Sequence, residues 1–348
     1  MIKNFKASFL PITVVCAAAW LGNSAQAGVF KITPGTAAGA FAGQQELFEA
    51  FLQRLEDEVN AELPSVETGE YTKGMANATA MAMTGSATAY GPVFSLGLIG
   101  VNAGVGVDLG KGNSISDFDA KKAAGFGTQV AVTAGLNPSA LYSTPFTERL
   151  QLFLGFMAAS RKLDDVEADF TSFGATAKYK LYAPKNLASS LVKWQGLDIS
   201  AGVRFAKLKG TFTQILDEQF TDSVSGQTAT VTGPATIGGD VKVFSIPIEA
   251  SSTLRLAYFL NLIGGAAVDF NFGSSTAIAS YVSDIDLGGN GTATGDLDLG
   301  SKTSPTMLNA RAFLGTGVEF AVGSLNLIFG KSLTARAWSV NTMLNFFW

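Results

Sequence analysis

Histidine is absent from the 348-residue chain, and the only cysteine, Cys16, lies near the amino end. A chain without histidine can form no Ser-His-Asp triad and no zinc site that uses imidazole. One cysteine allows no intramolecular disulfide and no cysteine-rich metal site. The sequence therefore predicts that the protein is not an enzyme, needs no cofactor and binds no metal.

The amino end has the three parts of a secretory signal peptide. Lys3 and Lys6 supply a positive segment, Phe9 to Leu21 an apolar one, and Ala25-Gln26-Ala27 a cleavage site. The apolar segment is too short for a transmembrane helix. We expect residues 1–27 to be removed on export, together with Cys16.

Beyond this leader there is no apolar run of about 18 residues, so membrane-spanning helices are excluded. Two of the 24 basic side chains belong to the leader, which leaves 22 basic against 28 acidic in the mature chain. An acidic chain without a basic cluster is not expected to bind nucleic acid. With 47% apolar residues and 39 glycines, the chain fits either a soluble all-β protein or a membrane β-barrel.

One segment has helical periodicity. Apolar residues recur at helical spacing between Gln44 and Leu63, acidic residues surround them, and Pro64 ends the pattern. This predicts an amphipathic helix within an N-terminal helical or plug segment, residues 28–92. Three roles stay open for the helix: a plug in or under a barrel, an oligomerisation element, or a structural cover.

From about residue 93 the period changes to two, so each segment presents one apolar and one polar face. Ten strands are predicted: 93–110, 123–137, 147–160, 166–182, 196–211, 240–259, 262–273, 306–322, 325–332 and 337–348. Many reach the roughly 9–11 residues that cross a bilayer at a tilt. The pattern predicts an all-β, antiparallel up-and-down transmembrane β-barrel of about ten strands, within a range of 8–12, over residues 93–348.

The connections alternate in length. Two long ones, 213–239 and 274–305, are rich in Thr, Ser, Gly and Asp, whereas the turns near Asn261 and Gly323-Ser324 are short. Long loops outside and short turns inside are typical of outer-membrane barrels. We therefore expect 213–239 and 274–305 to be extracellular loops.

The last strand carries a resemblance. Its alternating residues end on an aromatic side chain, in the order Trp338, Val340, Leu344, Phe346 and Trp348. This end resembles the assembly signal of Gram-negative outer-membrane β-barrels of the porin-like class. The resemblance implies an outer-membrane location, with membrane lipid and the barrel assembly machinery as partners.

A second resemblance covers less of the chain. The stretch from Ile246-Pro247-Ile248-Glu249-Ala250-Ser251 to Gly264-Gly265-Ala266-Ala267-Val268-Asp269-Phe270 looks like spirochaete surface-barrel proteins, some of them adhesins. It implies a surface ligand that binds through the long loops. A homo-oligomer is a further partner that the sequence leaves open.

If the apolar faces meet lipid, their alternates line the lumen. The charged residues predicted there are Arg149, Lys178, Lys180, Arg204, Arg255, Arg311, Asp108, Asp198, Glu249, Asp269 and Glu319. Charged side chains in a narrow lumen must form ion pairs or remain hydrated. They form either an ion-paired structural interior or a ladder that guides a substrate.

Three functions follow from this reading. The first is a narrow, partly plugged passive pore for small solutes. The second is a surface-binding or adhesin barrel with a closed pore, and the third is a transporter of hydrophobic compounds. A soluble β-sandwich is the alternative fold, but it must explain the long strands, the aromatic end and the leader together.

Overall fold

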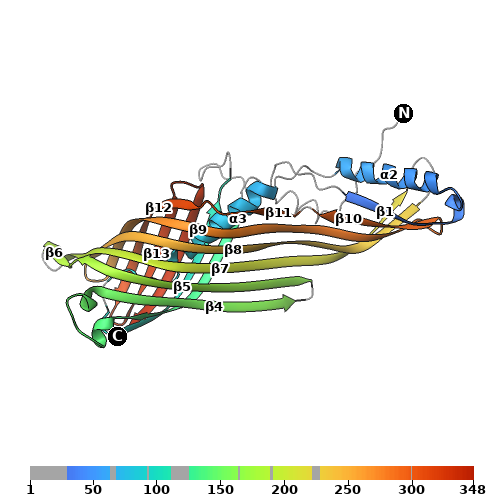
Figure 1. Ribbon diagram of the computed structural model, residues 1–348. Coiled ribbons are helices and arrows are strands. Elements are labelled where there is room, and N and C mark those ends of the chain that lie inside the picture. Colours follow the sequence, from blue (N-terminus) through green and yellow to red (C-terminus); the bar gives the residue numbers. More distant parts are fainter. Residues whose placement is uncertain are drawn as a thin grey trace.

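The computed structural model describes residues 30–348 except 63–67, 92–93, 111–124, 164, 189–190, 222–227 and 299. The expected signal peptide lies outside these residues. Ten of the described strands form a closed antiparallel ring (Figure 1). In order around the ring they are β2 (Gly97–Asp108), β3 (Gly125–Leu136), β4 (Leu150–Leu163), β5 (Val166–Tyr182), β7 (Val192–Thr221), β8 (Thr228–Leu256), β9 (Leu260–Asp286), β12 (Leu308–Phe320), β13 (Gly323–Ser332) and β14 (Ala337–Phe347). The pairing of β14 with β2, and of β8 with both β7 and β9, closes the ring. The prediction of an antiparallel barrel of about ten strands is confirmed.

Shorter elements extend this ring. The remaining described strands are β1 (Phe30–Ala37), β6 (Lys185–Ala188), β10 (Gly291–Asp298) and β11 (Ser301–Thr303). The described helices are α2 (Gln45–Glu62), α3 (Thr68–Ala82) and the 3-10 turns η1 (Gly39–Phe41), η2 (Met83–Gly85), η4 (Pro138–Ala140) and η5 (Thr147–Arg149). None of these described helices has the length and apolar character that crossing a membrane requires.

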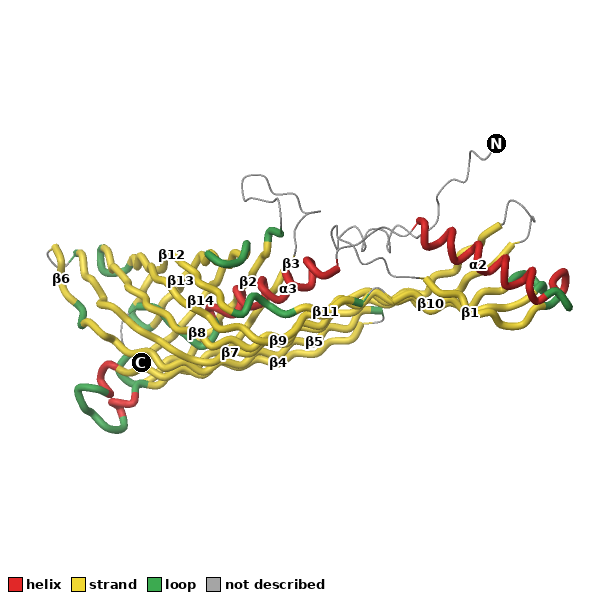
Figure 2. Tube along the Cα trace, turned by 45° about the horizontal axis from the view of Figure 1, so that its top comes forward, coloured by secondary structure: helices red, strands yellow, loops and turns green. Residues whose placement is uncertain are grey.

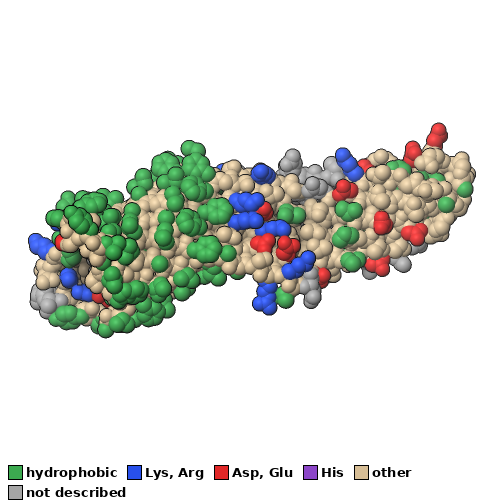
Figure 3. Space-filling model, turned by 60° about the horizontal axis from the view of Figure 1, so that its bottom comes forward, with side chains coloured by type: hydrophobic (Ala, Val, Ile, Leu, Met, Phe, Trp, Pro, Cys, Tyr) green, Lys and Arg blue, Asp and Glu red, His purple; other side chains and the backbone are tan. Residues whose placement is uncertain are grey.

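The alternation of side chains gives the barrel an apolar outside. On β2, Ile99, Val101 and Val105 are 41–50% exposed, whereas Asn102 between them is fully buried. The other barrel strands repeat this pattern, and on the face that Figure 3 shows, apolar side chains cover the barrel end of the molecule. A soluble protein does not expose a continuous apolar belt of this kind. The chain is therefore a transmembrane β-barrel.

Three barrel strands continue far beyond the belt. β7, β8 and β9 stay paired to the ends of β7 and β9, and β10 and β1 extend the same sheet (Figures 1 and 2). We call this extension, residues 30–62, 211–221, 228–238 and 276–298, the arm. The prediction of loops at 213–239 and 274–305 is wrong over most of the described residues, because backbone pairing between neighbouring strands orders these polar segments as sheet.

Helix α2 lies on the arm, away from the barrel. Its Phe48, Phe51 and Leu52 pack on Val231 and Ile285 of the arm sheet. It also covers the free edge of β1. Asn60 accepts a hydrogen bond from the backbone N–H of Phe30 at 2.7 Å, and Glu56 accepts one from that of Ile32 at 2.7 Å. The interpretation of this helix as a barrel plug is wrong: it is a cover that protects an exposed strand edge.

Candidate functional site: the filled lumen and the arm

A different segment occupies the lumen. Helix α3, η2 and residues 86–91, which we call the plug, run inside the ring against the inner faces of β2, β3, β8, β9 and β14 (Figure 2). The side chains of Ala76, Ala78, Ala82 and Met83 are fully buried. A helix that is buried all round needs no polar face. The lumen of this narrow barrel is therefore filled by protein rather than open along its axis.

Small residues on both partners allow this close packing. A Cβ atom added to Gly106 would overlap the carbonyl oxygen of Ala78, and one added to Gly127 would overlap the backbone nitrogen of Thr79. The sequence carried a signal for this segment. No charged residue occurs between Lys73 and Asp108. An uncharged Ala-, Met- and Thr-rich stretch with weak periodicity fits burial on all sides, which a search for amphipathic faces misses.

Hydrogen bonds join the plug to the barrel wall along its length. At the arm end, Asn77 donates to the carboxylate of Asp108 at 2.9 Å and accepts from the backbone N–H of Thr306 at 2.8 Å. Farther along, Asn102 donates to the carbonyl oxygen of Gly85 at 2.9 Å, and Asn341 donates to the hydroxyl of Thr84 at 2.9 Å. These bonds satisfy polar groups that burial would otherwise leave costly.

An ion cluster anchors the plug at the middle of the wall. Arg311 lies between Glu249 and Asp269, each of which it reaches at 2.9 Å. The hydroxyl of Tyr90, on the plug, donates to the other oxygen of Glu249 at 2.9 Å. Arg204 is buried within electrostatic range of the same groups. Buried charges that pair and are hydrogen-bonded in this way make a cross-link rather than an ion path.

A second cluster surrounds Asp198. Lys180 reaches this carboxylate at 2.8 Å and Lys178 reaches it at 3.2 Å. Lys178 also donates to the carbonyl oxygen of Ala89 on the plug at 2.7 Å. Toward the carboxyl-terminal end of the barrel, Arg255 pairs with Glu319 at 2.7 Å, with both side chains partly exposed.

Most of the predicted lumen residues thus meet one another inside the ring. Buried side chains form two ion clusters: Arg311, Glu249 and Asp269 in one, and Lys178, Lys180 and Asp198 in the other, while Arg204 is buried near the first without an ion pair to a described residue. Asp108 holds the plug, and Arg255 pairs with Glu319. Arg149 does not belong to this set, because it lies exposed at the end of η5, before β4 begins.

The residues predicted as an assembly signal lie on the outer wall of β14 and just beyond it. Val340, Leu344, Phe346 and Trp348 are 37–56% exposed, and the intervening Asn341 and Met343 are buried. Trp338 carries Lys331 over its ring, 4.8 Å from the centroid. The alternation places the aromatic and aliphatic members toward lipid.

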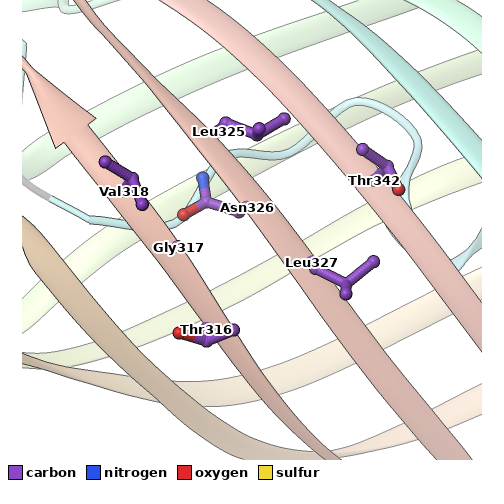
Figure 4. A pocket seen from close by; sticks show the side chains of 7 residues that line it. All are labelled: Thr316, Gly317, Val318, Leu325, Asn326, Leu327 and Thr342. Atoms are coloured by element: carbon purple, nitrogen blue, oxygen red, sulfur yellow. The ribbon is translucent and has the colours of Figure 1, made fainter.

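Two surface hollows also face outward. One lies on β12, β13 and β14, where Val318, Leu325 and Thr342 line it (Figure 4). The other lies on β2 to β5 around Ile99 and Phe156. Both are shallow depressions of the apolar belt, so they contact lipid rather than a soluble ligand.

The arm has two unlike faces. Its inner face continues the lumen side of the wall, and α2 covers part of it around Val231 and Ile285. Its outer face continues the lipid side of the wall but is mostly polar and open, although Ile215 and Val282 are exposed on it. One row of directly paired residues crosses five strands there, and all five side chains are exposed: Thr33, Thr294, Asp284, Thr232 and Asp217.

Comparisons place the chain among known proteins. A family model described as Lsa36-like matches residues 24–348. No curated protein matches the chain. Among solved structures, it is similar to the translocator domain of the autotransporter NalP from Neisseria meningitidis, with 13% identity, a TM-score of 0.30, and coverage of 90% of this chain and 99% of that one.

Two other solved structures have similar coverage. The Ralstonia pickettii toluene transporter TbuX has 9% identity and a TM-score of 0.24, covering 79% of this chain and 98% of its own. The attachment invasion locus protein Ail of Yersinia pestis has 12% identity and a TM-score of 0.21, covering 72% and 97%.

Proposed function

The chain belongs to the Lsa36-like family, and from this premise we propose that it is a surface-binding outer-membrane protein whose barrel is a closed anchor and whose arm carries the binding surface. The observation that carries the proposal is the contrast between a filled lumen and a polar sheet that continues outside the membrane belt. An adhesive role of this kind agrees with the resemblance to spirochaete surface-adhesin barrels.

Two short connections at the end of the barrel opposite the arm support an extracellular arm. At the end of the barrel where β14 finishes, β8 and β9 are joined through residues 257–259, and β12 and β13 through residues 321–322. The arm lies at the opposite end. Outer-membrane barrels have short periplasmic turns and longer extracellular connections. The amino-terminal part of the mature chain, including β1, would then lie outside the cell, with the plug passing back through the barrel.

A passive pore is the less favoured function. Small solutes or hydrophobic compounds would have to displace the plug, with its bonds from Tyr90 to Glu249 and from Lys178 to Ala89. Breaking such buried charge-assisted bonds costs about 1.5–3 kcal/mol each. Reconstitution in planar bilayers tests this point. We expect no steady conductance from the full chain, and discrete regular openings would contradict a closed anchor.

Attachment measurements test the arm. The hairpin of β7 and β8 can be shortened by joining Thr213 to Thr236, which face each other in the sheet, through an Asn-Gly turn. Bacteria that express the full chain should attach to cultured epithelial cells, and bacteria that express the shortened chain should attach several-fold less. Surface labelling and heat-modifiable migration would verify equal amounts of folded barrel.

A control variant changes an exposed side chain at the other end of the barrel. Leu141→Ser changes an 81% exposed side chain in the connection between β3 and β4. This variant should attach like the full chain. If the shortened arm attached equally well, the arm would not be the binding surface.

A further inference from the structure

A row of phenylalanines marks where the wall leaves the membrane on the arm side. Phe156, Phe173, Phe205, Phe244 and Phe272 pair directly with one another across β4, β5, β7, β8 and β9. All five lie on the outer face, and Phe156 is 59% exposed. Aromatic girdles of this kind form at the edge of the apolar band of outer-membrane barrels. The row therefore locates the level of the lipid headgroups.

Two lysines stand directly above this row. Lys207 follows Phe205 by two residues on β7, and Lys242 precedes Phe244 by two on β8, so both point outward. They pair directly with each other across the sheet. Like charges at opposite positions destabilise a sheet. Their placement therefore calls for a source of negative charge at this level.

The wall supplies only part of that charge. In the same cross-strand row, the partners on β5 and β9 are Thr171 and Ser274. Lys242 contacts Asp240 at 3.2 Å, but its side chain is 50% exposed. Among the described residues no ion pair of Lys207 is found. Figure 3 shows basic and acidic side chains gathered where the apolar belt ends.

The next row outward is different. Lys209 lies opposite Asp169 on one side and Asp240 on the other, and it pairs with Glu167 at 3.2 Å. The row next to the belt therefore contains only basic charged residues. Acidic residues occur in the next outward-facing row, two residues or about 7 Å farther along each strand. This order matches a bilayer surface, where phosphates lie immediately above the hydrocarbon.

We propose that Lys207 and Lys242 bind the phosphate of an anionic membrane lipid, with its acyl chains against Phe205, Phe244 and Phe272. The aromatic rings of Phe244 and Phe272, 6.4 Å apart between centroids, form the apolar floor of this site. The site is separate from the arm surface and does not depend on what the arm binds.

The test uses the full chain in nanodiscs of phosphatidylcholine with a minor fraction of phosphatidylglycerol, extracted into mild detergent. Native mass spectrometry counts the phosphatidylglycerol that stays bound. The double variant Lys207→Gln, Lys242→Gln should retain this lipid with an affinity roughly fivefold weaker for each lysine removed. Lys209→Gln is the matched control, because Lys209 lies one outward-facing row farther from the belt than Lys207 and its charge pairs with Glu167, and it should retain the lipid like the unchanged chain.

Three outcomes would overturn the proposal. They are equal retention by the double variant, an equal loss in Lys209→Gln, and displacement of the lipid by millimolar inorganic phosphate or oleate. The first two would mean that the lysine pair does not select the lipid. The third would mean that free phosphate, or negative charge without phosphate, is the true ligand. Heat-modifiable migration of each variant verifies that the barrel is folded.

Discussion

Strands β7, β8 and β9 each pass through two environments, and their outward residues change where the environment changes. On β8 the outward positions read Ile248, Ile246 and Phe244 within the belt, and Lys242, Asp240 and Thr232 beyond it. On β8 nearly all described inward positions are buried in both regions, under the plug in the barrel and under α2 along part of the arm. The same sheet geometry thus serves lipid and water, and only the outward residues distinguish them.

The largest difference between the two regions should appear when a buried charge is removed. Arg311→Met leaves Glu249 and Asp269 buried without their partner, which should cost about 3–5 kcal/mol of unfolding free energy. Its counterpart on the arm, Asp284→Asn, changes an exposed carboxylate and should stay within about 0.5 kcal/mol. Urea titration of the protein folded into lipid measures both, and a comparable loss from the two variants would refute the cross-link.

Changes on the outer face should show where the membrane ends. Ile248→Arg introduces a charge into the apolar belt and should lower the stability of the folded barrel in lipid by about 2–4 kcal/mol. Thr232→Arg is on the same strand and the same face but lies on the arm, so it should change stability by less than about 0.5 kcal/mol. If Thr232→Arg were as harmful as Ile248→Arg, the arm too would lie in lipid.

A smaller and local effect is expected in the arm cluster. Leu52→Ala removes a buried side chain from the contact between α2 and the arm sheet, at a cost of about 2 kcal/mol because a thin cluster can partly collapse. The arm should then become sensitive to limited proteolysis while the barrel keeps its heat-modifiable migration. Loss of the barrel together with the arm would show that the two regions unfold as one unit.

Most of the barrel could be predicted because each wall strand obeys a local rule. Alternation with a period of two identifies a strand and both of its faces without reference to any neighbour. The same alternation assigned Lys178, Asp198, Glu249, Asp269 and Arg311 to the inner face, and all five side chains are buried. Arg149 was misplaced because its strand begins only at Leu150.

The arm was missed for the opposite reason. Stretches rich in Thr, Ser and Asp lack the apolar alternation that indicates a strand, and β-propensity depends strongly on context. Residues 230–238 and 276–286 become strands because β8 and β9 are already aligned by the barrel below them, so each further residue adds hydrogen bonds in an existing register. The helix at Gln45–Glu62 was found, but its apolar stripe could not reveal which surface it covers.

The sequence by itself determined the class of protein: a chain with long alternating strands, an apolar outer face and an aromatic last strand is a membrane barrel. Local periodicity suffices for this, because lipid and lumen impose opposite demands on neighbouring residues. Only the tertiary structure decided that the uncharged segment after Lys73 fills the lumen and that α2 lies outside the lumen, on the arm. Both segments contain apolar residues, and which of them occupies the lumen depends on the size of their side chains. Small Ala and Gly surfaces fit a narrow ring, whereas the bulky Phe48 and Phe51 fit the open sheet of the arm.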